Sequence, residues 1–166
     1  MKIVCSYCKK DMGEREPRND ARYSHGICPD CFAYNMAQID AIVLDEKTGN
    51  LDKPVVVLNE EMRLLACNRK AEQVLGKQRR HLVGLKGGEF LDCTRSWQIE
   101  GCGRSPECRD CMIRKTFTNT RDDGAKRERI PALLHTTENG APVIRNLLIS
   151  AEKLEDRVQL RIDKIS

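Results

Sequence analysis

The sequence predicts an α+β domain that is preceded by a small metal-binding module and a linker helix. Two Cys-x2-Cys pairs lie near the N-terminus of the 166-residue chain, and a stretch with helical spacing of apolar residues follows them. The remainder places two strand-like runs before several helical segments and three further strand-like runs. We therefore divide the chain into a module (1–35), a linker helix and turn (36–53) and a domain (54–166).

The N-terminal module carries four cysteines with the spacing of a structural zinc site. Nineteen residues separate the pair Cys5 and Cys8 from the pair Cys28 and Cys31, which is within the range for such sites. Each pair can fold as a tight knuckle, and the polar segment between them cannot form a core, so metal binding must supply most of the folding free energy. We predict one zinc ion bound by four thiolates. His25 is a weaker candidate ligand, and a redox-labile dithiol pair is the alternative.

The linker is predicted to be an amphipathic helix over residues 32–47 that ends at the turn of residues 48–50. Met36, Ile39, Ile42 and Val43 recur every three or four residues. Such a helix is either a passive spacer or a connector that forms a dimer. Two heptads are fewer than the three or four that indicate a coiled coil.

The second domain begins with a predicted strand hairpin. Its strands are residues 55–58 and 64–67, and a short helix capped by Asn68 and ended by Gly76 follows. Three strands near residues 126–136, 143–151 and 157–165 complete the domain. The predicted core positions are Val55, Val57, Leu65, Val74, Leu75, Phe117, Leu147, Ile149, Leu160 and Ile162.

Between these parts lies a cysteine-rich insertion, residues 93–111, which carries Cys93, Cys102, Cys108 and Cys111. Ser105 and Pro106 predict that a helix begins there and runs to about residue 120. Cys108 and Cys111 would then share one helical face, where the helix dipole, with Arg104 and Arg109, favours their thiolates.

We predict that these four cysteines bind one cofactor, either zinc or an iron–sulfur centre. Their spacing matches neither common ferredoxin pattern, which favours zinc. A redox pair formed by Cys108 and Cys111 is the alternative.

Residues 54–165 resemble a PAS sensor domain. The resemblance rests on the order of elements and on VVVLNEEMRLLACNRKAEQVLG, in which a strand hairpin runs into an Asn-capped helix that ends in Gly. It implies a five-stranded antiparallel sheet with helices on one face, a ligand or cofactor cavity and frequent dimerisation. The segment SHGICPDC is similar to zinc-ribbon-like modules at the start of some bacterial signalling proteins.

Two other cofactors of PAS domains have no support in this sequence. The insertion lacks the Asn-Cys-Arg-Phe-Leu-Gln signature of flavin photosensors, so light sensing is not expected. His81 and His135 are the candidate haem ligands, and nothing in their surroundings favours haem.

Charge and hydropathy indicate the compartment and the partners. No apolar run approaches the roughly 20 residues that span a membrane, and no signal peptide is recognisable, so we expect a cytoplasmic protein that binds no membrane. The net charge of +4 resides in residues 54–166, where Lys77, Arg79, Arg80 and His81 form the densest basic run. Such a run is more often a solvated face than a nucleic-acid contact, and 4% aromatic residues offer little base stacking.

These patterns predict a non-enzymatic bacterial signalling or sensor module whose Cys-ligated metal or redox-responsive cluster changes its contacts with protein partners. The expected partners are a kinase or a regulator and a second copy of the chain. One alternative is a zinc-dependent nucleic-acid-binding transcription regulator. The other is a small thiol oxidoreductase that uses Cys108 and Cys111.

Overall fold

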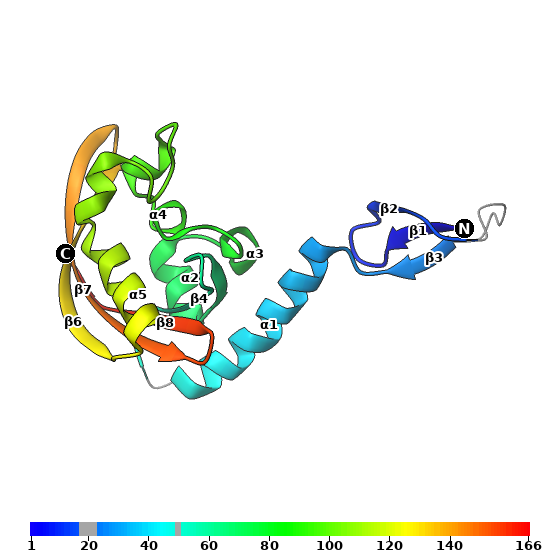
Figure 1. Ribbon diagram of the computed structural model, residues 1–166, viewed down its shortest axis with the longest axis horizontal. Helices are drawn as coiled ribbons and strands as arrows, with labels where there is room; N and C mark the ends of the chain where they lie inside the picture. Colours follow the sequence, from blue (N-terminus) through cyan, green and yellow to red (C-terminus); the bar gives the residue numbers. More distant parts are fainter. Residues whose placement is uncertain (17–22, 49–50) are drawn as a thin grey trace.

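The computed structural model describes residues 1–16, 23–48 and 51–166. A small sheet and a larger α+β domain lie at opposite ends of helix α1 (Pro29–Thr48), as Figure 1 shows. Helix α1 begins three residues earlier than predicted, because Pro29 suits the first helical position and Asp30 favours the first turn. Residues 49–50 of the predicted turn lie outside the described residues.

The small sheet has three short strands, β1 (Lys2–Cys5), β2 (Asp11–Glu14) and β3 (Tyr23–Gly26), in the order β2-β1-β3. Strand β1 pairs antiparallel with β2 and parallel with β3. This arrangement brings Cys5, at the end of β1, beside Gly26 at the end of β3. The register therefore places the first cysteine pair next to the segment that carries the second.

The larger domain contains the predicted five-stranded antiparallel sheet. Its strands are β4 (Val55–Leu58), β5 (Leu64–Cys67), β6 (Arg127–Glu138), β7 (Ala141–Leu154) and β8 (Arg157–Ile165), in the order β5-β4-β8-β7-β6. Every pair of neighbouring strands is antiparallel. The β6–β7 hairpin turns at Asn139 and Gly140, both with positive φ, as the Asn-Gly dipeptide predicts.

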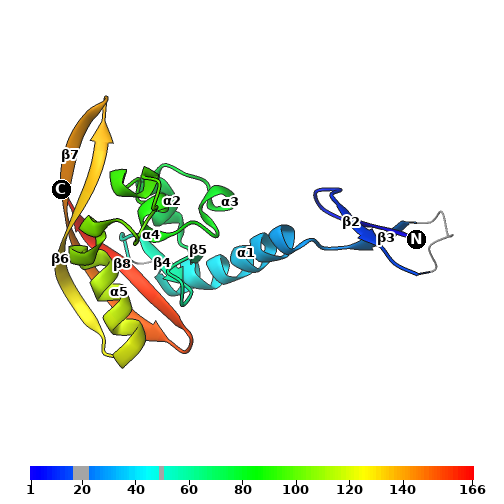
Figure 2. The ribbon, with the colours of Figure 1, turned by 45° about the horizontal axis from the view of Figure 1, so that its top comes forward.

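The helices that follow the first hairpin lie on one face of this sheet, as predicted, and the linker helix α1 packs its C-terminal part against the other face. Figures 1 and 2 show α2 (Arg69–Leu75), α3 (Arg79–Leu82), α4 (Gly87–Phe90) and α5 (Met112–Asp123) on one side. Alternate residues of β4 point to opposite faces. Val56 and Leu58 belong to the main core, whereas Val55 and Val57 pack with Leu44 of α1.

The predicted helix after Ser105 is interrupted. Residues Pro106–Asp110 form a 3₁₀ helix, η2, and α5 begins only at Met112. The amide of Cys111 bonds to the carbonyl of Cys108 (3.3 Å), which closes the 3₁₀ turn, and the Ser105 hydroxyl donates to the Glu107 carboxylate instead of capping the helix. Cys108 and Cys111 thus do not share a face of one α-helix, and Arg104 and Arg109 are exposed.

Most predicted core positions are buried, with clear exceptions. The side chains of Phe117, Leu147, Ile149, Leu160 and Ile162 lie in the main core. Val74 is 39% exposed, so its assignment was wrong. Leu65 on β5 is half-buried, between the buried Leu64 and Ala66. Leu75 is half-buried too, because the short helix α2 turns only Ala71 fully inward.

Candidate metal centre and thiol-lined cavity

The four N-terminal cysteines meet at one point. Their sulfur atoms lie within 4.8 Å of one another, and those of Cys8 and Cys28 are 3.7 Å apart. Tetrahedral zinc with Zn–S bonds of about 2.3 Å holds its sulfurs about 3.8 Å apart. The donor set and its spacing therefore fit a single tetrahedral ion. His25, the weaker candidate, is exposed and is not part of this group.

Different local structures position the two pairs. Cys5 and Cys8 lie in one tight turn, which closes at Lys9: this residue has a positive φ, and its amide bonds to the Cys5 carbonyl (3.0 Å). This is the predicted knuckle. The second pair instead opens α1, since Cys28 lies just before Pro29 and Cys31 lies in the first turn.

Backbone amides point at the sulfurs of this group. The Cys28 amide lies 3.4 Å from Cys5 Sγ, and this bond, with one from the Cys8 amide, lowers the pKa of the Cys5 thiol to about 6. The Cys28 thiol, through a side-chain hydrogen bond, and burial raise the pKa of Cys31 to about 12. The cluster without metal therefore already favours one thiolate and retains a proton on another.

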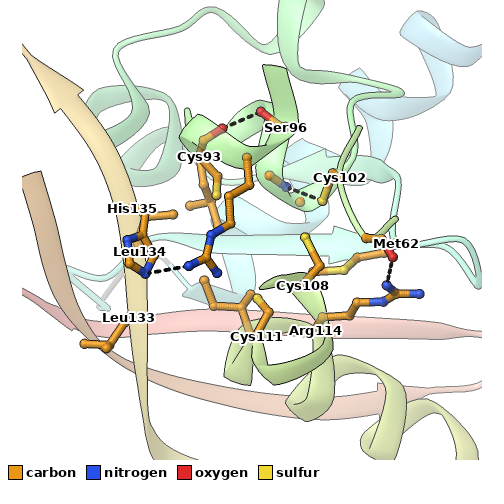
Figure 3. A pocket seen from close by; sticks show the side chains of 16 residues that line it. Met62, Cys93, Ser96, Cys102, Cys108, Cys111, Arg114, Leu133, Leu134 and His135 are labelled. Atoms are coloured by element: carbon orange, nitrogen blue, oxygen red, sulfur yellow. Dashed lines mark hydrogen bonds between the residues drawn. The ribbon is translucent and has the colours of Figure 1, made fainter. Parts of the chain in front are cut away.

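The four cysteines of the insertion line a single cavity in the larger domain (Figure 3). The cavity has a volume of about 40 Å³ and lies between α4, η1 (Thr94–Trp97), η2, the start of α5 and strand β6. Non-cysteine side chains that line it include Met62, Arg95, Arg114, Leu134 and His135. The structure thus brings together the cysteines that were predicted to act as one unit.

Two contacts organise the wall of this cavity. The Gly88 amide donates to Cys102 Sγ (3.2 Å), and burial raises the pKa of the Cys102 thiol. A Cβ atom on Gly88 would lie 2.8 Å from that sulfur, so only glycine allows this approach. Gly88 was not among the predicted site residues, although adjacent glycines beside a cysteine cluster indicate close backbone approach.

Arg95 was also missed as a site residue. Its guanidinium lies 3.3 Å from His135 Nε2 and donates to the Glu107 carbonyl (3.1 Å), so it bridges η1, η2 and β6. His135 therefore lines the cavity itself, with its Nε2 beside the Arg95 guanidinium. His81, the other candidate haem ligand, is exposed and does not line the cavity.

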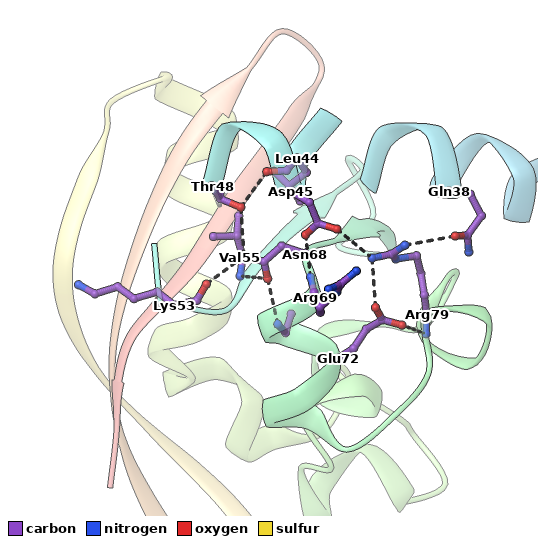
Figure 4. Close-up of polar contacts among 11 residues, drawn as sticks. Gln38, Leu44, Asp45, Thr48, Lys53, Val55, Asn68, Arg69, Glu72 and Arg79 are labelled. Atoms are coloured by element: carbon purple, nitrogen blue, oxygen red, sulfur yellow. Dashed lines mark hydrogen bonds and ion pairs between the residues drawn. The ribbon is translucent and has the colours of Figure 1, made fainter. Parts of the chain in front are cut away.

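Polar contacts fasten α1 to the domain, as Figure 4 shows. Arg79 of α3 forms ion pairs with Asp45 of α1 (3.6 Å) and Glu72 of α2 (3.1 Å) and bonds to Gln38 of α1 (3.2 Å). Lys77 pairs with Asp92 (2.6 Å). Two cations of the predicted basic run are thus engaged within the protein.

No family model matches the chain, and no curated protein matches it. Solved PAS and sensor domains are similar in structure. One is a domain of a sensory box sensor histidine kinase/response regulator from Geobacter sulfurreducens, with 12% identity and a TM-score of 0.47 over 76% of this chain and 96% of that one. Another is the PAS domain of Bordetella pertussis BvgS, with 13% identity and a TM-score of 0.44 over 78% of this chain and 87% of that one.

A third similar structure is the photoactive yellow protein domain of the sensor histidine kinase Ppr from Rhodospirillum centenum. Its identity is 11% and its TM-score 0.45, over 80% of this chain and 99% of that one.

Within the described residues, no helix is both long and apolar enough to cross a lipid bilayer.

Proposed function

We propose that this chain is a non-enzymatic cytoplasmic sensor module in which zinc holds the N-terminal module together and the thiol-lined cavity is the sensing site. The observation that carries the proposal is that Cys93, Cys102, Cys108 and Cys111 line one cavity. Thiols respond to metal and to oxidants, so a cavity lined by four of them can change state with either. The resemblance of residues 54–165 to PAS sensor domains supports the same role.

One short chain segment, residues 79–88, connects a contact at this cavity with a contact on α1. Gly88 of α4 bonds to Cys102, and Arg79, nine residues earlier in the chain, holds α1 through Asp45. A change at Cys102 that moves α4 would therefore also displace the segment between Gly88 and Arg79. That displacement would strain the ion pair between Arg79 and Asp45 of α1. We take α1 as the element that transmits the signal.

Helix α1 also offers a contact surface. Phe32, Met36, Ile39 and Val43 are all more than 40% exposed and follow the four-three-four spacing of a coiled-coil seam. The buried residues of α1, Ala37, Leu44 and Thr48, lie on another face. The spacing suits a second copy of the same helix, and we propose that copy as the first partner. A kinase or regulator would then bind the resulting dimer.

Hydrogen exchange of α1 tests the proposal. The zinc-loaded full chain is treated with a mild thiol oxidant, and amide exchange in residues 38–48 is compared before and after. We expect a change in wild type that disappears when all four cavity cysteines are replaced by serine. The control is wild type that is reduced again after oxidation, which should return to the exchange of the untreated protein, because disulfide formation is reversible.

Unchanged exchange in wild-type α1 would contradict the sensor proposal. Salt-dependent binding to duplex DNA by the same preparation would instead favour the transcription-regulator alternative.

A further inference from the structure

The two four-cysteine groups of the chain differ in how closely their sulfur atoms approach one another. In the described part of the chain, only Cys5, Cys8, Cys28 and Cys31 bring three or more potential ligand atoms within 4.8 Å of one another. The cavity cysteines are all described, and they are not such a group. Since a single zinc needs sulfurs about 3.8 Å apart, the cavity thiols are too open for one zinc ion.

The volume of the cavity between these thiols is also larger than one metal ion requires. The cavity volume is about 40 Å³, whereas one water molecule needs about 10–15 Å³ by the same measure. Protein interiors are otherwise close-packed. The cavity therefore has room for a polyatomic group.

The charges around the cavity suit an anionic occupant. Arg95 and Arg114 both line it, and Arg95 is held in place by His135 and the Glu107 carbonyl. Arg114 is fixed at its far end by the Gly103 carbonyl. No carboxylate is among the residues that line the cavity. Two guanidinium groups would offset a net charge of about −2, the charge of an oxidised iron–sulfur core with four cysteinate ligands.

We propose that Cys93, Cys102, Cys108 and Cys111 bind an iron–sulfur core, [2Fe–2S] or [4Fe–4S], and not a single zinc ion. In either core the four thiolates are shared among two or four iron atoms, so no three of them lie as close together as around one zinc ion. The proposal rests on the proposed function and names the cofactor of its sensing site. The Gly88 amide that points at Cys102 Sγ supplies the kind of N–H···S hydrogen bond that tunes such centres.

Loading can proceed by ligand exchange alone. Each cysteine thiol displaces one outer thiolate from a preassembled core, an Fe–S(Cys) bond forms as an Fe–S(outer) bond breaks, and the cysteine proton leaves on the displaced thiol. No electron is transferred, so no oxidant or reductant is required.

The test uses the full chain, purified without oxygen and loaded with zinc at the N-terminal site. It is mixed with synthetic [2Fe–2S] or [4Fe–4S] cores that carry simple thiolate ligands, and is then desalted. We expect iron and sulfide in equal amounts, two or four of each per chain, together with visible charge-transfer absorption and unchanged zinc. The stoichiometry and the spectrum after reduction distinguish the two cores.

Single serine variants at the four cavity positions should each reduce core uptake by at least tenfold. Cys5→Ser is the matched control, because it should lose zinc and still take up the core. Binding of a second zinc without core uptake would overturn the proposal, as would uptake that all four serine variants retain. The proposal would also be overturned if the wild-type chain takes up no core and forms a Cys108–Cys111 disulfide. None of these results determines the hydrogen-exchange response of α1. The proposed sensor function is therefore tested independently of the iron–sulfur core.

A second measurement reports on charge. Arg95→Gln removes one cation from the cavity wall, whereas Arg104→Gln removes an exposed cation that does not line it. We expect the loaded Arg95→Gln variant to be reduced at a lower potential than wild type and the Arg104→Gln variant to match wild type. Equal potentials in all three proteins would contradict the placement of the core beside Arg95.

Discussion

The amide side chain of Asn68 donates a hydrogen bond to the hydroxyl of Thr48 (3.2 Å), and this contact joins the start of α2 to the last residue of α1. The same side chain donates to the Lys53 carbonyl (3.0 Å) and accepts from the amides of Val55 (3.1 Å) and Ala71 (2.9 Å). Asn68 is only 3% exposed. One buried residue thus ties the linker helix, strand β4 and helix α2 together.

Asn68→Ala should lower the free energy of unfolding by about 2 to 4 kcal/mol. The change removes a helix cap and leaves the buried Val55 amide without its side-chain partner. Thr48→Val removes the link from Asn68 to α1 and the bond from the Thr48 hydroxyl to the Leu44 carbonyl (2.7 Å), and it should cost about 1 kcal/mol. Urea denaturation of both variants measures the difference. Equal losses would show that the cap and the Val55 bond contribute nothing beyond the link to α1.

The main core predicts a second pair of variants. Ile149 is fully buried on β7, so Ile149→Ala should cost about 2 to 5 kcal/mol through lost transfer free energy and a residual cavity. Val74 on α2 is 39% exposed. Val74→Ala should change stability by less than about 0.5 kcal/mol. Thermal unfolding of the two variants checks the burial assignments, and a large loss at Val74 would contradict them.

Zinc binding at the N-terminal group should strengthen as pH rises, because metal displaces protons from thiols. The Cys5 thiol, with a pKa lowered to about 6, is already ionised at neutral pH and competes with protons only as pH falls through 6. Cys31, with a pKa raised to about 12, must release its proton when zinc binds at neutral pH.

Competition with a chromophoric chelator between pH 5 and 8 measures this dependence, and proton release at pH 7 measures the Cys31 contribution. Cys28→Ser should lose most of the affinity and leave the larger domain folded, because that domain has its own core. An affinity independent of pH would argue against thiolate coordination.

Self-association through α1 predicts a fourth result. Ile39 is 56% exposed in the middle of the apolar seam, so Ile39→Lys should shift the chain toward monomer at a given concentration. Ile99 is fully exposed in the cysteine-rich insertion, outside α1, and Ile99→Lys is the matched control. Sedimentation velocity compares the two variants with wild type. Dissociation by both variants, or by neither, would contradict the role of the seam.

The sequence alone determined the features that depend on local spacing. The paired Cys-x2-Cys motifs, the apolar period of α1 and the Asn-Gly hairpin each encode a local structure, and runs of apolar residues give the positions of strands β4 to β8 along the chain. The cysteine pattern also identified all eight thiols of the two groups, since each motif is contiguous or nearly so in the chain.

Only the tertiary structure decided how those thiols are placed and what surrounds them. The interruption of the helix at Cys111 comes from 3₁₀ bonds that compete with α-helical ones over a few residues, and helix-start signals cannot resolve that competition. Arg95 and His135 are forty residues apart and meet only because β6 packs beside η1. The open spacing of the cavity thiols, on which the proposed iron–sulfur core rests, is likewise a property of packing between segments, and the spacing of the cysteines along the chain does not reveal it.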